Sequence, residues 1–199
     1  MSRPALELVR APSDLDLAHR CAAGERAAQN RLFDQYIDLV HATLYRILGS
    51  NHEIEDLVQE AFFQVFRSLP NFRGESKLST WICRITTRAA FAYLQRKRPM
   101  SVHLEAVPDL ASSDPSAMRQ VMARQAIRRL YALLDELDPK QRIAFALHVL
   151  DGRPMNEVAK LTEATVVATK SRVLRARRKV RKDPVVAAFL DAPDFEEAD

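Results

Sequence analysis

The chain has 199 residues, of which 47% are hydrophobic and 28% are charged, and its formal net charge is +4. This length accommodates one large or two small domains that each bury a core, and the composition is typical of a soluble globular protein. The chain has four glycines and neither a GxGxxG nor a GxxxxGK pattern, which excludes a Rossmann fingerprint and a phosphate-cradling loop.

The apolar runs are short and interrupted by charges, and the N-terminal residues include no long apolar stretch. We therefore expect no membrane-spanning segment and no signal peptide, and we predict a cytoplasmic protein. Cys21 and Cys83 stand outside any CxxC pattern, and the histidines are scattered without a second ligand at metal-binding spacing. Reduced thiols, no metal site and no cofactor are predicted.

Every periodic segment has helical spacing. Asp14 is predicted to cap a short first helix that ends near Gly24, and a long second helix is predicted at about residues 25–48, before Gly49. Its apolar residues predicted to be buried are Leu32, Tyr36, Leu39, Val40, Leu44 and Ile47.

The third predicted helix, at residues 54–67, has the most completely specified pattern in the chain. Apolar residues recur at i, i+3, i+4 and i+7 spacing; they are Ile54, Leu57, Val58, Ala61, Phe62, Val65, Phe66 and Leu69. The opposite face carries Asp56, Gln59, Glu60, Phe63 and Arg67. A phenylalanine among acids and amides fits a protein-docking face, although single exposed aromatic residues are also common on protein surfaces.

A loop at residues 71–77 precedes a fourth predicted helix, which Ser79 or Thr80 caps and Pro99 ends. Its predicted core face is Trp81, Ile82, Ile85, Ala89 and Ala92. Another face carries Arg84, Thr87, Arg88, Phe91 and Gln95, with Arg96 beyond. Basic residues interleaved with an aromatic ring suit unstacked nucleic-acid bases, whereas the alternative is an ordinary amphipathic helix with a basic C-terminal end.

Residues 99–116 are predicted to form a flexible linker, because prolines and a Ser-Ser-Asp cluster replace any sustained apolar period. The linker separates a domain at residues 14–98 from a second domain at 117–182. An acidic tail follows at 183–199.

The second domain is predicted to be helical throughout. A helix at about residues 118–137 is followed by one that Asp138 caps and that extends to about Leu150. A short helix at 154–161, a turn and a last helix at 165–182 then form a helix-turn-helix.

The last helix, which Thr165 is predicted to cap, carries eight Lys or Arg residues and no acid. Its predicted packed stripe is Val166, Thr169, Val173, Ala176 and Val180, and its outward face is Val167, Ser171, Arg172, Arg175, Arg178 and Lys182. Such a helix reads base edges with its N-terminal residues and contacts phosphates with the later bases. We therefore predict DNA binding rather than a solvated basic helix. The acidic tail either folds back on this helix or forms a solvated end.

Two sets of residues resemble bacterial sigma factors. The segments Glu55-Asp56-Leu57-Val58-Gln59-Glu60-Ala61-Phe62, Phe72-Arg73, Ser79-Thr80-Trp81-Ile82 and Ile85 resemble region 2. The segments Leu134-Asp135-Glu136-Leu137-Asp138, Glu157-Val158-Ala159 and Lys170-Ser171-Arg172-Val173-Leu174-Arg175-Ala176-Arg177 resemble region 4. With these two regions and a short linker, the chain is similar to the extracytoplasmic-function branch of the sigma-70 family. The implied fold is all-α, with a region 2 helical bundle joined by the linker to a region 4 helix-turn-helix.

The resemblance implies a role for each surface. Asp56, Gln59, Glu60 and the neighbouring Phe63 would dock on the clamp helices of the largest subunit of core RNA polymerase. The residues implied for melted −10 promoter DNA are Phe72, Arg73, Lys77, Trp81, Arg84, Thr87, Arg88, Phe91 and Arg96. Those implied for the −35 duplex are Val167, Lys170, Ser171, Arg172, Arg175 and Arg178. The linker would thread toward the active-site channel of the polymerase.

The implied protein is an initiation factor and not an enzyme, and an anti-sigma factor would hold it inactive. The sequence contains no cluster of nucleophile, base and metal ligands that would indicate an enzyme. The alternative is a helix-turn-helix regulator whose N-terminal helices dimerise, and binding to core polymerase distinguishes the two.

The chain departs from the family pattern at positions that affect promoter choice. Arg88 and Ala92 stand where Asn and Asp are common, and Gln95-Arg96 replaces an Arg-Arg pair. Val167-Ala168-Thr169 stands in place of Gly-Thr-Val, and Glu163 occupies a turn position where glycine is frequent. The preferred promoter sequence is therefore not implied by the resemblance.

Overall fold

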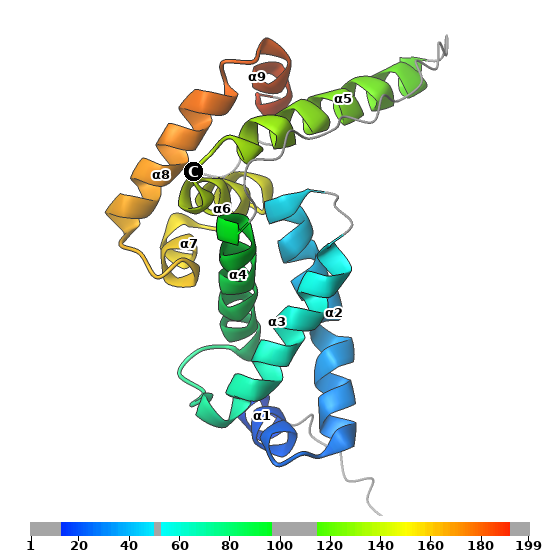
Figure 1. Cartoon of the computed structure of the whole chain (residues 1–199), viewed down its shortest axis with the longest axis vertical. Coiled ribbons are helices and arrows are strands. Elements are labelled where there is room, and N and C mark those ends of the chain that lie inside the picture. Colours follow the sequence, from blue (N-terminus) through cyan, green and yellow to red (C-terminus); the bar gives the residue numbers. More distant parts are fainter. Residues whose placement is uncertain (1–12, 50–52, 97–114, 192–199) are drawn as a thin grey trace, which may run out of the picture.

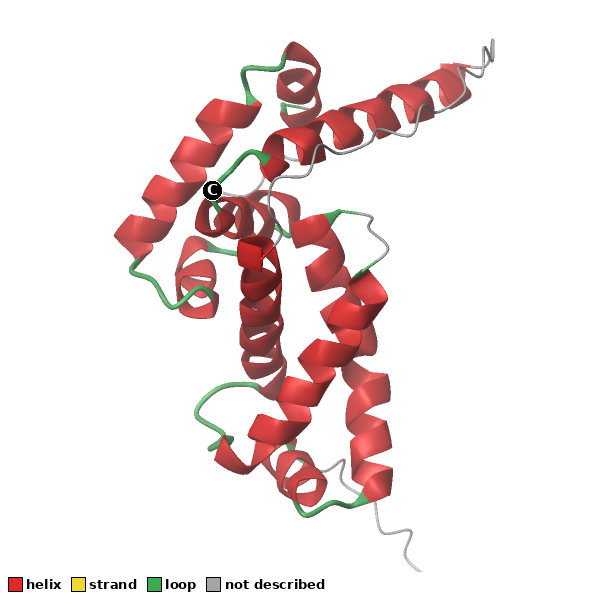
Figure 2. Cartoon of the chain, viewed as in Figure 1, coloured by secondary structure: helices red, strands yellow, loops and turns green. Residues whose placement is uncertain are grey.

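The computed structural model describes residues 13–49, 53–96 and 115–191, and every regular element in these ranges is helical (Figure 1). The elements are α1 (Asp14–Ala22), α2 (Arg26–Leu48), α3 (Ile54–Ser68), the 3₁₀ turn η1 (Leu69–Asn71), α4 (Leu78–Arg96), α5 (Pro115–Asp135), α6 (Pro139–Phe145), the π-helical η2 (Ala146–Leu150), α7 (Met155–Leu161), α8 (Val166–Val180) and α9 (Pro184–Leu190). The predicted all-α class is confirmed (Figure 2). The predicted linker falls almost wholly outside the described residues.

Helices α1–α4 form the first bundle, in which α2, α3 and α4 pack against one another. The apolar stripe predicted for α3 is buried, except that Phe66 is half-buried. The opposite face of α3 is exposed, and Phe63 on that face is 62% exposed. Helical periodicity therefore predicted both the buried and the exposed side of this helix correctly.

The N-terminal caps of the first bundle differ from the prediction. Ser13, and not Asp14, caps α1, because the backbone N–H of Asp16 donates to Ser13 Oγ at 3.2 Å. Asp14 Oδ2 instead accepts a hydrogen bond of 2.9 Å from the backbone N–H of Leu78. This N–H is one of the unpaired donors of the first turn of α4, so α4 begins before the predicted caps Ser79 and Thr80.

Helices α5–α9 form the second bundle. Asp138 caps α6 by accepting from the backbone N–H of Lys140 at 2.9 Å, and Thr165 caps α8 by accepting from Ala168 at 3.1 Å, as predicted. The predicted helix at residues 139–150 is interrupted, because its last turn widens into the π-helical η2. A wider turn of this kind is rare inside an α-helix.

Helix α9 lies within the segment predicted as an acidic tail. Asp183 caps it by accepting from the backbone N–H groups of Val185 and Val186. Val186 and Leu190 are buried in a small core with Leu130 and Leu134 of α5. The first part of this segment is therefore a packed helix, and the residues beyond Asp191 lie outside the described ranges.

The two bundles pack against each other and share one hydrophobic core. Ile143, Leu147 and Leu161 of the second bundle belong to the same buried cluster as the core residues of α1–α4. Helix α4 contacts α6 and α7, and α2 contacts η2. Figure 1 shows α4 running from the first bundle up to the second.

The C-terminal end of α2 is capped by two side chains of the second bundle. Arg142 donates from Nε to Ile47 O at 2.7 Å and from Nη2 to Leu48 O at 3.0 Å. The hydroxyl of Tyr131 lies 3.2 Å from Tyr45 O and 3.0 Å from Arg46 O, within hydrogen-bond range of both. The last four carbonyls of a helix have no partner in the helix itself. Here the backbone N–H of Gly49 donates to Tyr45 O at 2.8 Å, and the side chains of the second bundle provide donors for the other three.

Two features fix this junction. Arg142 is 3% exposed, and its guanidinium also pairs with the carboxylate of Asp135. Gly49, which follows α2, has φ +75°, and a Cβ there would lie 2.9 Å from Cδ1 of Tyr131. A glycine is therefore required both by the left-handed backbone and by the close approach of the tyrosine ring. Burial raises the pKa of Tyr131 to about 12, so its hydroxyl remains a donor at neutral pH.

Arg142→Ala should lower the free energy of unfolding by about 3 kcal/mol, because it leaves the half-buried Asp135 and two helix-end carbonyls without their partner. Urea denaturation followed by circular dichroism measures the change. Lys160→Ala, which removes an exposed cation on α7, is the control and should change stability by less than about 0.5 kcal/mol. Equal stability of the two variants would show that capping by Arg142 contributes nothing.

Candidate polymerase and nucleic-acid interfaces

The polar face of α3 presents the four residues predicted to dock on polymerase. Asp56, Gln59, Glu60 and Phe63 are all exposed, and their spacing places them on one side of the helix. Glu60 accepts a hydrogen bond of 2.7 Å from Nε2 of Gln64. The surface thus combines two carboxylates, an amide and an aromatic ring with no burial against the rest of the bundle.

The residues predicted for −10 DNA in the loop before α4 and in its first turn fall into two groups, one packed against the bundle and one exposed to solvent. Phe72 is 4% exposed and packs edge-on against Trp81, with ring centroids 5.3 Å apart. Trp81 is half-buried, whereas Arg73 and Lys77 are exposed. Phe72 therefore lies in the core of this structure, and the two exposed cations are the loop residues that solvent can reach.

The predicted nucleic-acid face of α4 is only partly accessible. Arg88 and Arg96 are exposed, and Arg84 and Phe91 are half-buried. Thr87 is 3% exposed, and its Oγ1 has no hydrogen-bond partner among the described residues.

The predicted core face of α4 needs one correction. Ala92 was predicted to be buried but is exposed, because Tyr93 takes the core position at this turn and is buried. Its hydroxyl donates to the carboxylate of Glu53. Burial is the main cause that raises the pKa of Tyr93, so this hydroxyl stays protonated and bonded.

The outward face of α8 presents the residues predicted for −35 DNA. Val167, Lys170, Arg175 and Arg178 are exposed, and Ser171 and Arg172 are half-buried. Val167 is 78% exposed at the N-terminal end of the helix. Val166, which was predicted to pack, is 41% exposed because it lies in the first turn, ahead of the buried stripe that begins at Thr169.

Residues predicted for the two promoter elements meet in one cleft between the bundles. The cleft has a volume of about 160 Å³ and is lined by Thr87, Arg88, Phe91, Lys140, Ile143, Leu161, Thr162, Glu163 and Arg172. Arg88 of α4 forms an ion pair with Glu163, in the turn of the helix-turn-helix. Nζ of Lys140 lies 5.9 Å from the ring centroid of Phe91, within the range of a cation–π contact.

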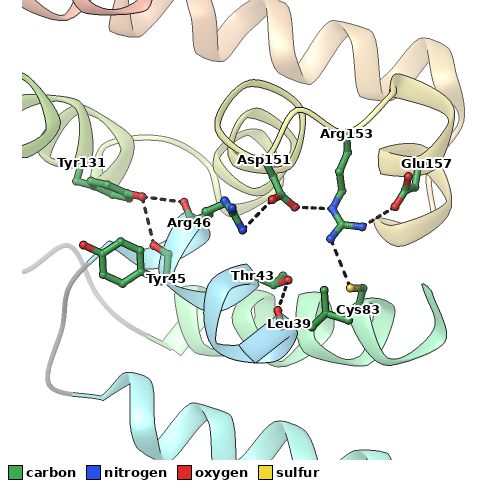
Figure 3. A network of polar contacts seen from close by, with 9 residues as sticks. All are labelled: Leu39, Thr43, Tyr45, Arg46, Cys83, Tyr131, Asp151, Arg153 and Glu157. Carbon is green, nitrogen blue, oxygen red and sulfur yellow. Dashed lines mark hydrogen bonds and ion pairs between the residues drawn. The ribbon is translucent and has the colours of Figure 1, made fainter. Parts of the chain in front are cut away.

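A second polar network joins the two bundles (Figure 3). Asp151 pairs with Nη1 of Arg46 at 2.9 Å and with Nε of Arg153 at 2.5 Å. Arg153 also pairs with Glu157 at 2.5 Å and points its Nη2 at Sγ of Cys83, 3.6 Å away. Burial raises the pKa of the Cys83 thiol, which keeps it protonated and unreactive in this packing.

Sequence reasoning missed the residues that connect the bundles, namely Arg142, Tyr131, Asp151 and Arg153. The partners of these residues in the first bundle lie far away in the sequence, on the other side of the predicted linker. Within the described ranges no group of three His, Cys, Asp or Glu residues could hold a metal ion. None of the helices in these ranges combines the length and the apolar character that a bilayer crossing requires.

Comparison with known proteins gives the family. Sigma-70 region 2 matches residues 32–99, and sigma-70 region 4 matches residues 127–180. The ECF RNA polymerase sigma-E factor of Escherichia coli (strain K12) is 30% identical over 177 residues, which cover 84% of this chain and 92% of that protein. The ECF RNA polymerase sigma factor SigE of Mycolicibacterium smegmatis is 30% identical over 167 residues, which cover 80% of this chain and 64% of that protein.

The fold is also found among solved structures. CnrH, determined in complex with the cytosolic domain of CnrY, superposes with a TM-score of 0.57 at 23% identity, covering 92% of this chain and 99% of that one. Two sigma-70 regions in the expected order and relatives matched along most of their length identify the family. This chain belongs to the extracytoplasmic-function branch of the sigma-70 family of RNA polymerase sigma factors.

Proposed function

We propose that the chain docks on the clamp helices of core RNA polymerase through the exposed face of α3, captures melted −10 DNA with α4 and the preceding loop, and reads the −35 duplex with α8. As a sigma-70 family member, the protein directs RNA polymerase to promoters by binding, without an enzymatic step of its own. The observation that carries the assignment is the exposed face formed by Asp56, Gln59, Glu60 and Phe63.

The α3 surface has the chemistry of a protein interface. Phe63 is 62% exposed on the same side of α3 as the carboxylates of Asp56 and Glu60. An exposed aromatic surrounded by polar groups can bury its area against a partner while the carboxylates pair with cations at the rim. In the rival dimeric regulator the same α3 face would pair with a second copy of the chain, so binding to core polymerase distinguishes the two functions.

The DNA surfaces differ in what they can read. The exposed cations Arg73, Lys77 and Arg88 can follow a phosphate backbone, and Trp81 and Phe91 offer rings against which an unstacked base can lie. Helix α8 offers Val167 and Lys170 in its first turns, where base edges are in reach. Its later arginines, Arg175 and Arg178, would contact phosphates and add affinity with little sequence preference.

A regulatory partner is the second part of the proposal. CnrH was solved with the cytosolic domain of CnrY bound to it. We infer that an anti-sigma protein likewise binds this chain, and that the chain acts in the cytoplasm, where core polymerase and promoter DNA are found. The rival function, a dimeric helix-turn-helix regulator, requires duplex binding without polymerase.

Transcription in vitro with purified core polymerase and fragments of genomic DNA tests the function as a whole. Initiation at defined start sites that requires this protein is the expected result, and the start sites give the −10 and −35 sequences together. Duplex binding without any transcript would favour the dimeric regulator instead.

Asp56→Ala and Phe63→Ala should each weaken binding to core polymerase by about 5- to 30-fold, because residues at the centre of an interface contribute about 1–2 kcal/mol each. Biolayer interferometry on immobilised core polymerase measures the affinities. Asp34→Ala, which removes an exposed carboxylate from α2 in the same bundle, should bind as the unsubstituted protein does. Unchanged affinity of both α3 variants would remove α3 from the interface.

Phe72→Ala and Arg73→Ala should affect promoter opening for different reasons. Phe72 is buried against Trp81, so its truncation should lower the free energy of unfolding by about 3–5 kcal/mol. Arg73→Ala should leave stability within about 0.5 kcal/mol and still reduce binding to a single-stranded −10 oligonucleotide. Denaturation curves and fluorescence anisotropy separate the two effects, and a fully stable Phe72→Ala protein would contradict the core assignment.

A further inference from the structure

The packed arrangement of the two bundles is incompatible with binding both promoter elements. The elements lie about 25 base pairs apart, or about 85 Å at ~3.4 Å per base pair. In this structure, however, Arg88 of α4 and Arg172 of α8 line the same cleft. On the surfaces assigned under the proposed function, the bundles have to separate before one promoter can occupy both.

The cleft covers the part of α4 that offers both a cation and a ring. Arg88 is paired with Glu163, the ring of Phe91 faces the ammonium of Lys140, and Thr87 is buried. A DNA strand that used this part of α4 would therefore meet the turn of the helix-turn-helix and the start of α6. The groups that would compete with the DNA strand for α4 are therefore residues of the same chain.

We propose that Glu163 masks Arg88: its carboxylate takes the place of a DNA phosphate, so that region 4 withholds α4 from the −10 strand until the bundles separate. A carboxylate and a phosphate oxygen offer a guanidinium the same kind of charged acceptor. Entry of the strand exchanges one anion for another on Arg88, and the half-exposed carboxylate of Glu163 is then solvated by water. The masking rests on the assignment of α4 to −10 DNA.

The backbone at Glu163 supports a role for its side chain. Glu163 has φ +51°, and it is the one non-glycine residue with positive φ in the described ranges. This left-handed conformation favours glycine. The chain thus keeps a glutamate at a strained position, and its carboxylate contacts Arg88.

The ion pair between Arg88 and Glu163 is weak enough for a DNA phosphate to replace the carboxylate. The side chains of Arg88 and Glu163 are 58% and 49% exposed, so water and salt screen their attraction. The shared apolar core, the buried Arg142 and the half-buried Asp151 join the bundles independently of this pair. Loss of the pair should therefore change affinity for the strand by about two- to fivefold and not unfold the junction.

Bundle separation can be measured without DNA. Dyes on Ala92→Cys and Ala188→Cys, both exposed, report the distance between α4 and α9 by single-molecule energy transfer, since the native Cys21 and Cys83 are buried. Glu163→Arg, which places two cations together, should increase the population with low transfer. Adding Arg88→Glu to Glu163→Arg reverses the pair and should restore the high-transfer population. Asp34→Arg makes the same charge change on α2 and should have no effect.

Binding of a single-stranded oligonucleotide, spanning the non-template −10 strand of a promoter that the protein transcribes, provides the second measurement. Glu163→Gly removes the carboxylate and relieves the left-handed backbone, so it should fold and bind the strand two- to fivefold more tightly than the unsubstituted chain. Masking would be overturned if Glu163→Gly bound the strand with the affinity of the unsubstituted chain. It would also be overturned if Glu163→Arg left the energy-transfer distribution unchanged. Energy transfer that responds while no variant binds the strand would instead overturn the assignment of α4 to −10 DNA, and the masking with it.

Discussion

The rest of the structure depends on the hydrogen bonds that the carbonyl groups at the C-terminal end of α2 accept. Four carbonyls at this end have no partner within the helix, and a helix end buried without partners is costly. The backbone N–H of Gly49 donates to one of them, and Arg142 and Tyr131, both from the second bundle, provide donors for the other three. The positive guanidinium also complements the negative end of the helix dipole. The bundles therefore meet at one defined register, which Gly49 permits by leaving room for the tyrosine ring.

That register decides which functional surfaces are free. The α3 face, with Phe63, points away from the junction and stays open to a protein partner. The cleft between α4 and the helix-turn-helix lies at the junction, so Arg88 and Phe91 are engaged by region 4. A factor packed in this way presents its proposed polymerase-binding surface while part of its proposed DNA surface is covered. Docking on polymerase can thus precede the exposure of α4.

Local sequence patterns predicted most of the helices, but they did not predict the contacts between residues far apart in the sequence. Periodicity gave the two faces of α3 because a helix position depends on residues one or two turns away. Asp138 and Thr165 were recognisable as caps for the same reason. By contrast, Arg142 donates to a carbonyl 95 residues earlier in the chain, and Asp14 caps a helix 64 residues away. Such pairings depend on how the bundles pack, which no local period encodes. The burial of Phe72 was not predicted for the same reason.

The chemistry of the junction also explains how it can open. Its polar groups, among them Arg142, Arg46 and Asp151, exchange protein partners for water when the bundles separate, so each contributes little net free energy. The apolar residues Ile143 and Leu161, buried in the shared core, supply the larger part of the attraction. Polar contacts therefore define the geometry, and the shared apolar core provides most of the strength. A partner that gains more by binding the separated bundles, as polymerase with promoter DNA would, can shift the equilibrium without unfolding either bundle.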